Sequence, residues 1–444
     1  MKDMKLEIKN FGPINEAEIE IGKITVIAGP NASGKTTSSK LFYCFLAASS
    51  SEGAYIINES IIQRLSRPLE RTIYKINNAD KREKIRDLRK QLRYIDDLVS
   101  NDEMLELYFD TINQVHIDFN KSEMEDINLI LSMILDNLVL YKNTLIHMLQ
   151  IEFNKPKLDD VKLSFKQSDI HNNQHEVLIC NDGVHKVTTD YLSFFEVKNV
   201  SYIETPYILD FFSHFRRVRN LPPRYRQVNR NHQSFLIEKL NAGEEKDVFD
   251  KTLNENIIQV QKKIQAIIEG NLRFDENTFQ FVFEQGDRSF HSKDVASGIK
   301  SVGILQMLLE NRQLPKDSYL IMDEPEVHLH PAWQVKLAEI LVLLSKELNI
   351  SVYVNSHSPH FIEAIEVYSK YYDSKYDKDV KWDFDSERDV KFYLTKENEE
   401  GKFNFKKIER NNLLEIYKCL SHPYDEIDAI RGKTRALDVV LGRD

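Results

Sequence analysis

The chain has 444 residues, a length that accommodates two or three domains, and 41% of its residues are hydrophobic, enough to fill sizeable cores. Its formal net charge of −10 excludes a protein that coats nucleic acid through overall positive charge, because such binding needs a basic surface. Cys44, Cys180 and Cys419 lack the paired spacing of a disulfide framework or a zinc motif, which favours a reducing compartment.

The N-terminal segment alternates charged and apolar residues, and no later window approaches the roughly 20 apolar residues of a membrane span. We therefore expect a soluble, cytoplasmic protein without membrane contact. The segments KLEIKNFGPI and EAEIEIGKITVIAG alternate polar and apolar residues or run apolar, which predicts strands.

A glycine-rich segment, GPNASGKTT, follows these strands and precedes a helix-like stretch, TTSSKLFYCFLAA. It matches G-x-x-x-x-G-K-[ST] in the context that this phosphate-binding motif requires. Its glycines let backbone N–H groups turn towards phosphates, its lysine reaches the β- and γ-oxygens, and its threonine hydroxyl suits Mg²⁺. The expected nucleotide-binding residues are Gly29, Asn31, Ser33, Gly34, Lys35, Thr36 and Thr37.

Residues 61–150 carry apolar side chains at three- and four-residue spacing, which predicts helices. A basic run within them, from Lys81 to Arg93, includes Glu83 and Asp87. Such neighbours favour a solvated helix face with internal ion pairs, and nucleic-acid contact is the alternative.

An arginine-rich segment, FFSHFRRVRNLPPRYRQVNR, follows further along the chain with almost no acidic residue. Two interpretations stay open for it, contact with a phosphate backbone or acidic partner, or internal pairing. The arginines are Arg216, Arg217, Arg219, Arg224, Arg226 and Arg230.

The segment DVASGIKSVGILQMLLE predicts a helix that opens on Ser297 and Gly298, so that its first N–H groups face an anion. After it, YLIM predicts a buried strand that ends at Asp323 and Glu324, at the edge where α/β sheets bind ligands. Asp323 is suited to binding Mg²⁺, and Glu324 is suited to polarising an attacking water. We expect the two side chains on opposite sides of the strand, because adjacent strand residues point in opposite directions.

The rival interpretation of this region is a zinc site built from His328 and His330, but their spacing matches no common zinc pattern. A further strand, SVYVN, ends before His357, which places a histidine at the same sheet edge, suited to sensing a γ-phosphate. In the tail, WDFDSE offers Asp383 and Asp385 as a D-x-D nuclease pair. We reject that interpretation because the remaining chain is short for a second α/β domain.

The segments GPNASGKTT, VASGIKS, LIMDEPEVHLHP and VNSHSP, in this order, resemble the ATPase head of the ABC-type SMC/RecF/OLD superfamily. The resemblance implies an α/β fold, with a P-loop mixed sheet flanked by helices and an inserted helical subdomain. It implies ATP and Mg²⁺ as cofactors and a homodimer of heads, with a larger ring left open.

Within such a head, Lys35, Glu324 and His357 would be catalytic, and Thr36 and Asp323 would hold Mg²⁺. Ser297 and Gly298 would reach the γ-phosphate bound by the other subunit. The signature departs from L-S-G-G-Q, so Lys300 is an added candidate for that contact, and Gln63 is one candidate for the Q-loop glutamine.

The resemblance also divides the chain into five parts. Residues 1–60 and 271–370 would form the two parts of the head, the second with the signature, Walker B and H-loop, and 61–150 would be a helical insertion. Residues 151–270 would complete the head with the arginine-rich segment, and 371–444 would be a docking segment.

A head without its own nuclease resembles the ATPase subunits of bacterial phage-defence systems of the PARIS and Septu types. The implied function is an ATP-gated sensor and scaffold that holds or activates a separate effector nuclease. The alternatives are a stand-alone RecF/SMC-like DNA-repair ATPase that binds DNA through Arg216 and Arg217, and a single-chain ATPase-nuclease that cuts at Asp383. A pseudo-ATPase binding module conflicts with the intact Lys35, Thr36 and Glu324.

Overall fold

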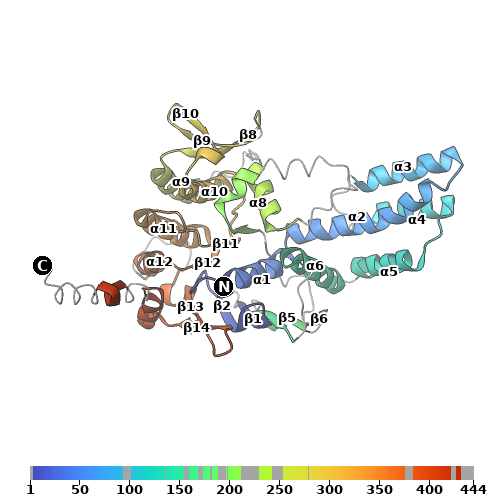
Figure 1. The fold of residues 1–444 in the computed structure, drawn as a ribbon. Helices are drawn as coiled ribbons and strands as arrows, with labels where there is room; N and C mark the ends of the chain where they lie inside the picture. The colour runs from blue at the N-terminus through green and yellow to red at the C-terminus, as the bar shows by residue number, and fades with distance from the viewer. Residues whose placement is uncertain are drawn as a thin grey trace, which may run out of the picture.

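The computed structural model describes residues 4–93, 102–135, 137–154, 160–168, 174–180, 183–188, 197, 199–211, 230–242, 254–278, 280–375, 384–421 and 427–431. Figure 1 shows a head of strands and helices from which helices α2 to α5 project to one side. The predicted α/β class, a P-loop mixed sheet flanked by helices with a helical insertion, is confirmed.

The head is built on one sheet, to which eleven strands contribute within the described ranges, in the order β6-β5-β4-β1-β2-β14-β13-β3-β12-β11-β7. Neighbours from β13 to β7 run parallel, whereas β1, β2, β4, β5 and β6 pair antiparallel. Their bounds are β1 Met4–Phe11, β2 Ile14–Ile21, β3 Ile24–Ala28, β4 Lys162–Ser168, β5 Gln174–Cys180, β6 Gly183–Thr188, β7 Val200–Ile203, β11 Tyr319–Asp323, β12 Ser351–Ser356, β13 Val390–Glu397 and β14 Phe403–Ile408.

The parallel strands are buried on both faces, which explains their continuous apolar sequences. Successive residues of β11 point to opposite sides, so Leu320 and Met322 enter one core while Ile321 enters the other. The first core lies against α10 (Ser297–Glu310), α11 (Pro331–Leu348) and α12 (Pro359–Tyr371), and the second against α1 (Lys35–Ala47). The sheet thus forms the middle layer between helices.

Most of the helical insertion has a hydrophobic core of its own, whereas its last helix packs in the second head core through Leu145, Met148 and Leu149. The insertion begins ten residues earlier than predicted, at Ser51, because Ser50 caps the first helix by accepting a hydrogen bond from Glu52 N. Its helices are α2 Ser51–Ile73, α3 Ala79–Arg93, α4 Asp102–Val115, α5 Lys121–Leu135 and α6 Asn137–Glu152.

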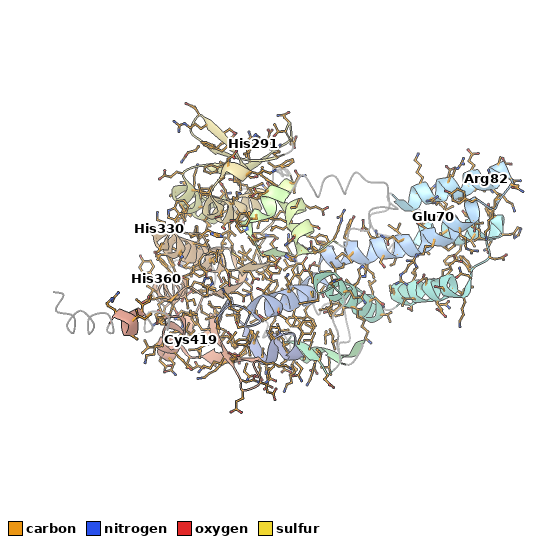
Figure 2. The ribbon with its side chains drawn as sticks, viewed as in Figure 1. Glu70, Arg82, His291, His330, His360 and Cys419 are labelled. Atoms are coloured by element: carbon orange, nitrogen blue, oxygen red, sulfur yellow. The ribbon has the colours of Figure 1, made fainter. Side chains whose placement is uncertain are left out.

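The basic run on α3 makes contacts within the insertion. Arg89 pairs with Glu70 on α2, and Lys84 donates to Gln114 at 2.8 Å. Figure 2 shows Glu70 and Arg82 on this projecting part of the molecule. These contacts favour the solvated helix face over the nucleic-acid interpretation.

The C-terminal docking segment predicted for 371–444 is wrong for residues 390–408, which form two strands of the main sheet. β13 lies parallel to β3, with Phe392 opposite Val26, and β14 joins β13 to β2. The short helix α13 (Ser386–Asp389) precedes β13, and Asp385 caps it by accepting from the backbone N–H groups of Glu387 and Arg388. Asp385 therefore has a structural role, whereas Asp383 lies outside the described residues.

A smaller sheet, in the order β10-β9-β8, covers one side of the head. Its strands are β8 Asn271–Asp275, β9 Gln280–Gln285 and β10 Arg288–His291, and β8 packs against α10. The helices α8 (His232–Asn241) and α9 (Asn254–Ile268) precede it in the chain. None of the helices in the described part of the chain is long and apolar enough to cross a membrane.

Candidate nucleotide-binding site

The glycine-rich segment lies between the end of β3 at Ala28 and the start of α1 at Lys35, as predicted. Left-handed backbone angles, φ of 61° at Ala32 and 91° at Gly34, turn the loop around the helix N-terminus. No side chain caps α1, and its first turn contains no acidic residue. The first N–H groups of α1 are thus left for an anionic ligand.

Lys35 is buried beneath this loop. Its Nζ donates to the carbonyl oxygens of Gly29 at 2.9 Å and Pro30 at 2.7 Å. Burial lowers the pKa of Lys35, and the carboxylates Glu324, Asp323 and Glu326 oppose that shift. The ammonium group therefore lies where the loop would enclose phosphates.

Asp323, the last residue of β11, is buried against α1. Its Oδ1 accepts hydrogen bonds from Ser39 Oγ at 3.0 Å and from Asn355 Nδ2, and its Oδ2 accepts from Tyr202 OH at 2.9 Å. Burial raises the pKa of Asp323, while hydrogen bonds, first among them that from Thr36, oppose the rise. Thr36 and Asp323, the two predicted Mg²⁺ ligands, are thus brought together.

Glu324 turns away from Asp323, towards Lys35 and His357. Its Oε1 lies 3.7 Å from Lys35 Nζ and 3.4 Å from His357 Nδ1. The two carboxylates point in different directions, but strand alternation, the predicted reason, is wrong. Glu324 lies beyond the end of the strand, and its left-handed φ of 44° turns the chain there. His357 directly follows β12, as predicted, and its proximity lowers the pKa of Glu324.

Sequence reasoning missed a third carboxylate, Glu326, which is 2% exposed. Its Oε1 accepts hydrogen bonds from Ser356 Oγ at 2.5 Å and from His357 N at 3.1 Å. It thereby ties the loop after β11 to the loop after β12. The sequence signal was its place in DEPE, three residues after Asp323.

The signature segment begins α10 at Ser297, again without a side-chain cap. Gly298 packs so closely on the loop after β11 that an added Cβ would lie 2.7 Å from Leu329 Cδ2. Lys300 does not fit the expectation of a γ-phosphate contact, because it is buried and its Nζ lies 2.7 Å from Asp210 Oδ2. The charge of Lys300 is therefore paired with that of Asp210 inside the head.

Other predicted residues lie apart from this cluster. Gln63 is exposed on α2 in the insertion, and Arg216, Arg217, Arg219, Arg224 and Arg226 lie outside the described residues. His330 caps α11 by accepting from Ala332 N at 3.3 Å, and Figure 2 shows it near one side of the head. His330 therefore has a structural role rather than the zinc-binding role of the rival interpretation.

The residues present fit a magnesium nucleotide. Ser33 Oγ is buried without a hydrogen-bond partner among the described atoms, and it lies in the loop before the uncapped start of α1. The oxygens of Thr36 and Asp323 are the hard donors that Mg²⁺ prefers. Lys35 and the α1 N-terminus provide the positive charge that phosphates require.

Among the solved structures that the chain matches are three heads of Smc proteins. One is an Smc head bound to the C-winged helix domain of ScpA (11% identity, TM-score 0.38, covering 93% of this chain and 99% of that chain). Another is the SMC head domain from Thermotoga maritima, with 11% identity and a TM-score of 0.33, covering 92% of this chain and 100% of that chain. The third, from Pyrococcus furiosus, is an Smc head with an extended coiled coil bound to the C-terminal domain of ScpA. It has 14% identity and a TM-score of 0.37, covering 94% of this chain and 99% of that chain.

These identities and TM-scores are low, and no curated protein matches the chain. A family model described as the AAA ATPase domain, in contrast, matches residues 1–362, which include the glycine-rich loop, the β11 carboxylates and His357. The chain belongs to the AAA ATPase domain family.

Proposed function

We propose that this chain binds ATP with Mg²⁺ and hydrolyses it slowly, with Glu324 activating the attacking water. The observation that carries the proposal is the position of Glu324, between Lys35 Nζ at 3.7 Å and His357 Nδ1 at 3.4 Å. Bound ATP supplies the γ-phosphoryl group, and Mg²⁺ neutralises its charge. Lys35 and the start of α1 hold the phosphates, and Thr36 and Asp323 hold the metal.

Glu324 suits the role of general base because it is partly exposed and charged. The nearby His357, with Nδ1 at 3.4 Å, followed by the attraction of Lys35, keeps the pKa of Glu324 below its ordinary value despite partial burial. A carboxylate that stays ionised can orient a water molecule and accept its proton. His357, with its Nδ1 beside Glu324, is placed to orient that carboxylate and to sense the γ-phosphate.

The minimal active unit in this proposal is an ABC-type dimer of heads. The uncapped start of α10 at Ser297 and Gly298 offers N–H groups to a γ-phosphate, in the manner expected from the resemblance to SMC/RecF/OLD heads. Hydrolysis then depends on assembly, because each site needs the α10 start of the other subunit. Lys300 stays out of this contact, since it pairs with Asp210.

We further propose that the dimer is a cytoplasmic sensor and scaffold of an anti-phage complex that holds or activates a separate effector nuclease. This step rests on the resemblance to phage-defence ATPases. The projecting helices α2 to α5, with a hydrophobic core separate from that of the head, support it as a surface for partner contact. The alternative is a stand-alone DNA-repair ATPase.

The test is to purify the tagged chain from its host with ATP at mild salt and identify the bound molecules by mass spectrometry. A stoichiometric nuclease that is lost in Lys35→Ala supports the ATP-gated scaffold, because that variant removes the phosphate-binding ammonium. A homodimer that carries only DNA overturns the scaffold in favour of the repair ATPase.

A further inference from the structure

Asp323 accepts a hydrogen bond from a tyrosine of the neighbouring strand. Tyr202 lies on β7, which pairs with β11 so that Tyr202 is opposite Ile321. Its hydroxyl donates to Asp323 Oδ2 at 2.9 Å, on the opposite oxygen from the one that Ser39 and Asn355 hold. The two carboxylate oxygens are therefore held from two sides, and Tyr202 fixes one of them.

Tyr202 is in turn held by His232, the first residue of α8. The two rings are stacked, with centroids 4.4 Å apart and an interplanar angle of 29°. Both side chains are almost fully buried, at 1% and 2% exposure. The tyrosine ring therefore cannot move away from Asp323 without disturbing His232.

The His232 ring lies between two carboxylates and contacts both. Its Nδ1 lies 2.7 Å from Glu152 Oε2 and its Nε2 lies 3.0 Å from Glu204 Oε2, while its backbone N donates to Glu152 Oε1 at 2.7 Å. A neutral imidazole can donate from only one nitrogen, so the imidazolium ion satisfies both contacts. Glu204 also pairs with Lys40 of α1 at 2.6 Å.

The same helix, α8, contacts both ends of the helical insertion. Glu152 is the last residue of α6, where the insertion returns to the head. At the other end of α8, Lys239 Nζ contacts Glu52 near the start of α2, and it donates to Asn199 Oδ1 at 2.6 Å just before β7. Buried contacts thus join both ends of the insertion to α8, and Lys239 joins α8 to the segment just before β7.

We propose that Tyr202 is a positioning residue for the Mg²⁺-binding carboxylate, that His232 couples it to the end of α6, and that Lys239 of the same helix links α8 to the start of α2. This inference rests on the proposed ATPase function. It assigns the insertion a role in setting the metal affinity of the nucleotide site. A partner that binds the insertion would act on ATP turnover by this route.

The first test measures Mg²⁺ affinity in Tyr202→Phe, which removes only the hydroxyl. Loss of one such supporting hydrogen bond weakens metal binding by about tenfold. We expect that shift in calorimetric titrations of Mg²⁺ into protein with a non-hydrolysable ATP analogue, while analogue binding without Mg²⁺ stays within about twofold of native. An unchanged Mg²⁺ affinity overturns the proposal.

A matched control is Tyr393→Phe on β13, another buried tyrosine, whose hydroxyl accepts from Glu20 N at 2.8 Å. This variant loses a comparable hydrogen bond away from Asp323, so its melting temperature falls while its Mg²⁺ affinity stays native. Equal losses of Mg²⁺ affinity in both variants would show a general loss of stability instead of positioning.

The second test is a double-mutant cycle between His232→Gln and Tyr202→Phe. If His232 acts through Tyr202, the His232→Gln substitution weakens Mg²⁺ binding in the native background and causes no further loss of Mg²⁺ affinity in the Tyr202→Phe background. Additive losses overturn the coupling. Glu204→Gln, at a less buried position, replaces His232→Gln if that variant does not fold.

Failure of the underlying function is distinguishable. If the native protein binds the analogue with Mg²⁺ no better than Lys35→Ala does, the ATPase proposal fails. If the native protein binds it well but Tyr202→Phe has the native Mg²⁺ affinity, only the positioning role fails.

Discussion

Three carboxylates within four residues of DEPE lie in three environments. Asp323 is buried against α1, Glu324 is partly exposed beside Lys35 and His357, and Glu326 is buried beneath the loop after β12. The nearby His357 lowers the pKa of Glu324, whereas burial raises the pKa of Glu326. Similar side chains therefore suit different tasks: a metal ligand, a base and a structural acceptor.

We expect Glu326→Ala to lower the free energy of unfolding by about 1–3 kcal/mol, because it leaves Ser356 Oγ and His357 N without their acceptor. Glu326→Gln keeps an acceptor oxygen, and the Oε2 that it replaces has no partner among the described atoms, so it should be much milder. Urea denaturation measures both variants. Equal losses would mean that the charge of Glu326, not its acceptor, holds the two loops.

At this scale the sequence predicted the residues that carry local motifs and missed those that only the fold brings near. Lys35 and Asp323 belong to spacing patterns with a known chemistry, and the structure brings them together. Tyr202 and His232 belong to no such pattern, because they reach Asp323 through strand pairing and ring stacking. Lys300 looked like a free cation until the structure showed Asp210 beside it.

Among the secondary-structure elements, β13 shows most clearly what local pattern cannot predict. Its sequence, VKFYLTKE, lies far along the chain in what looked like a docking segment, yet it pairs with β3 beside the glycine-rich loop. Strand order depends on pairings between distant segments, which periodicity does not encode. The position of β11 and β12, in contrast, follows from their apolar runs and the polar residues at their ends.

β13 also restricts the glycine-rich loop, which leads to a prediction for Gly29→Ala. A Cβ at Gly29 would lie 1.8 Å from Thr395 Oγ1 and 3.0 Å from Thr395 Cβ, at a φ of 152°, so either the Thr395 side chain rotates or the loop shifts away from β13. We expect ATP-analogue binding to weaken by roughly tenfold or more, since the loop positions the phosphates. Calorimetry of analogue binding measures the change.

The control is Gly286→Ala in the turn between β9 and β10, where φ is 58° but no atom lies within 4 Å of the added Cβ. That variant carries backbone strain without a clash at the loop. It should lose a little stability and bind the analogue normally. If both variants bind equally well, close packing of the loop on β13 has no bearing on binding.

At the scale of the whole molecule, helices α2 to α5 have a core separate from that of the head, and the insertion meets the head through α6, which packs in the second head core, and through the ion pairs of α8. The layered head was predicted from the resemblance of its motifs to a known family of ATPase heads, and the insertion from the three- and four-residue spacing of its apolar residues. The sequence could not predict the link between them, since Glu52, Glu152 and Lys239 each look like ordinary surface charges in sequence. An ATP-dependent switch needs such a link between its nucleotide site and its projecting part.

In the proposed mechanism, Glu324 activates water in a site where Lys35 holds the phosphates. The most direct measurement is single-turnover ATP hydrolysis by Glu324→Gln beside its analogue affinity, with Lys35→Ala as the binding-deficient control. We predict a loss of about 10²-fold or more in hydrolysis, with binding retained in Glu324→Gln and lost in Lys35→Ala. Hydrolysis by Glu324→Gln at the native rate would contradict the assignment of the base.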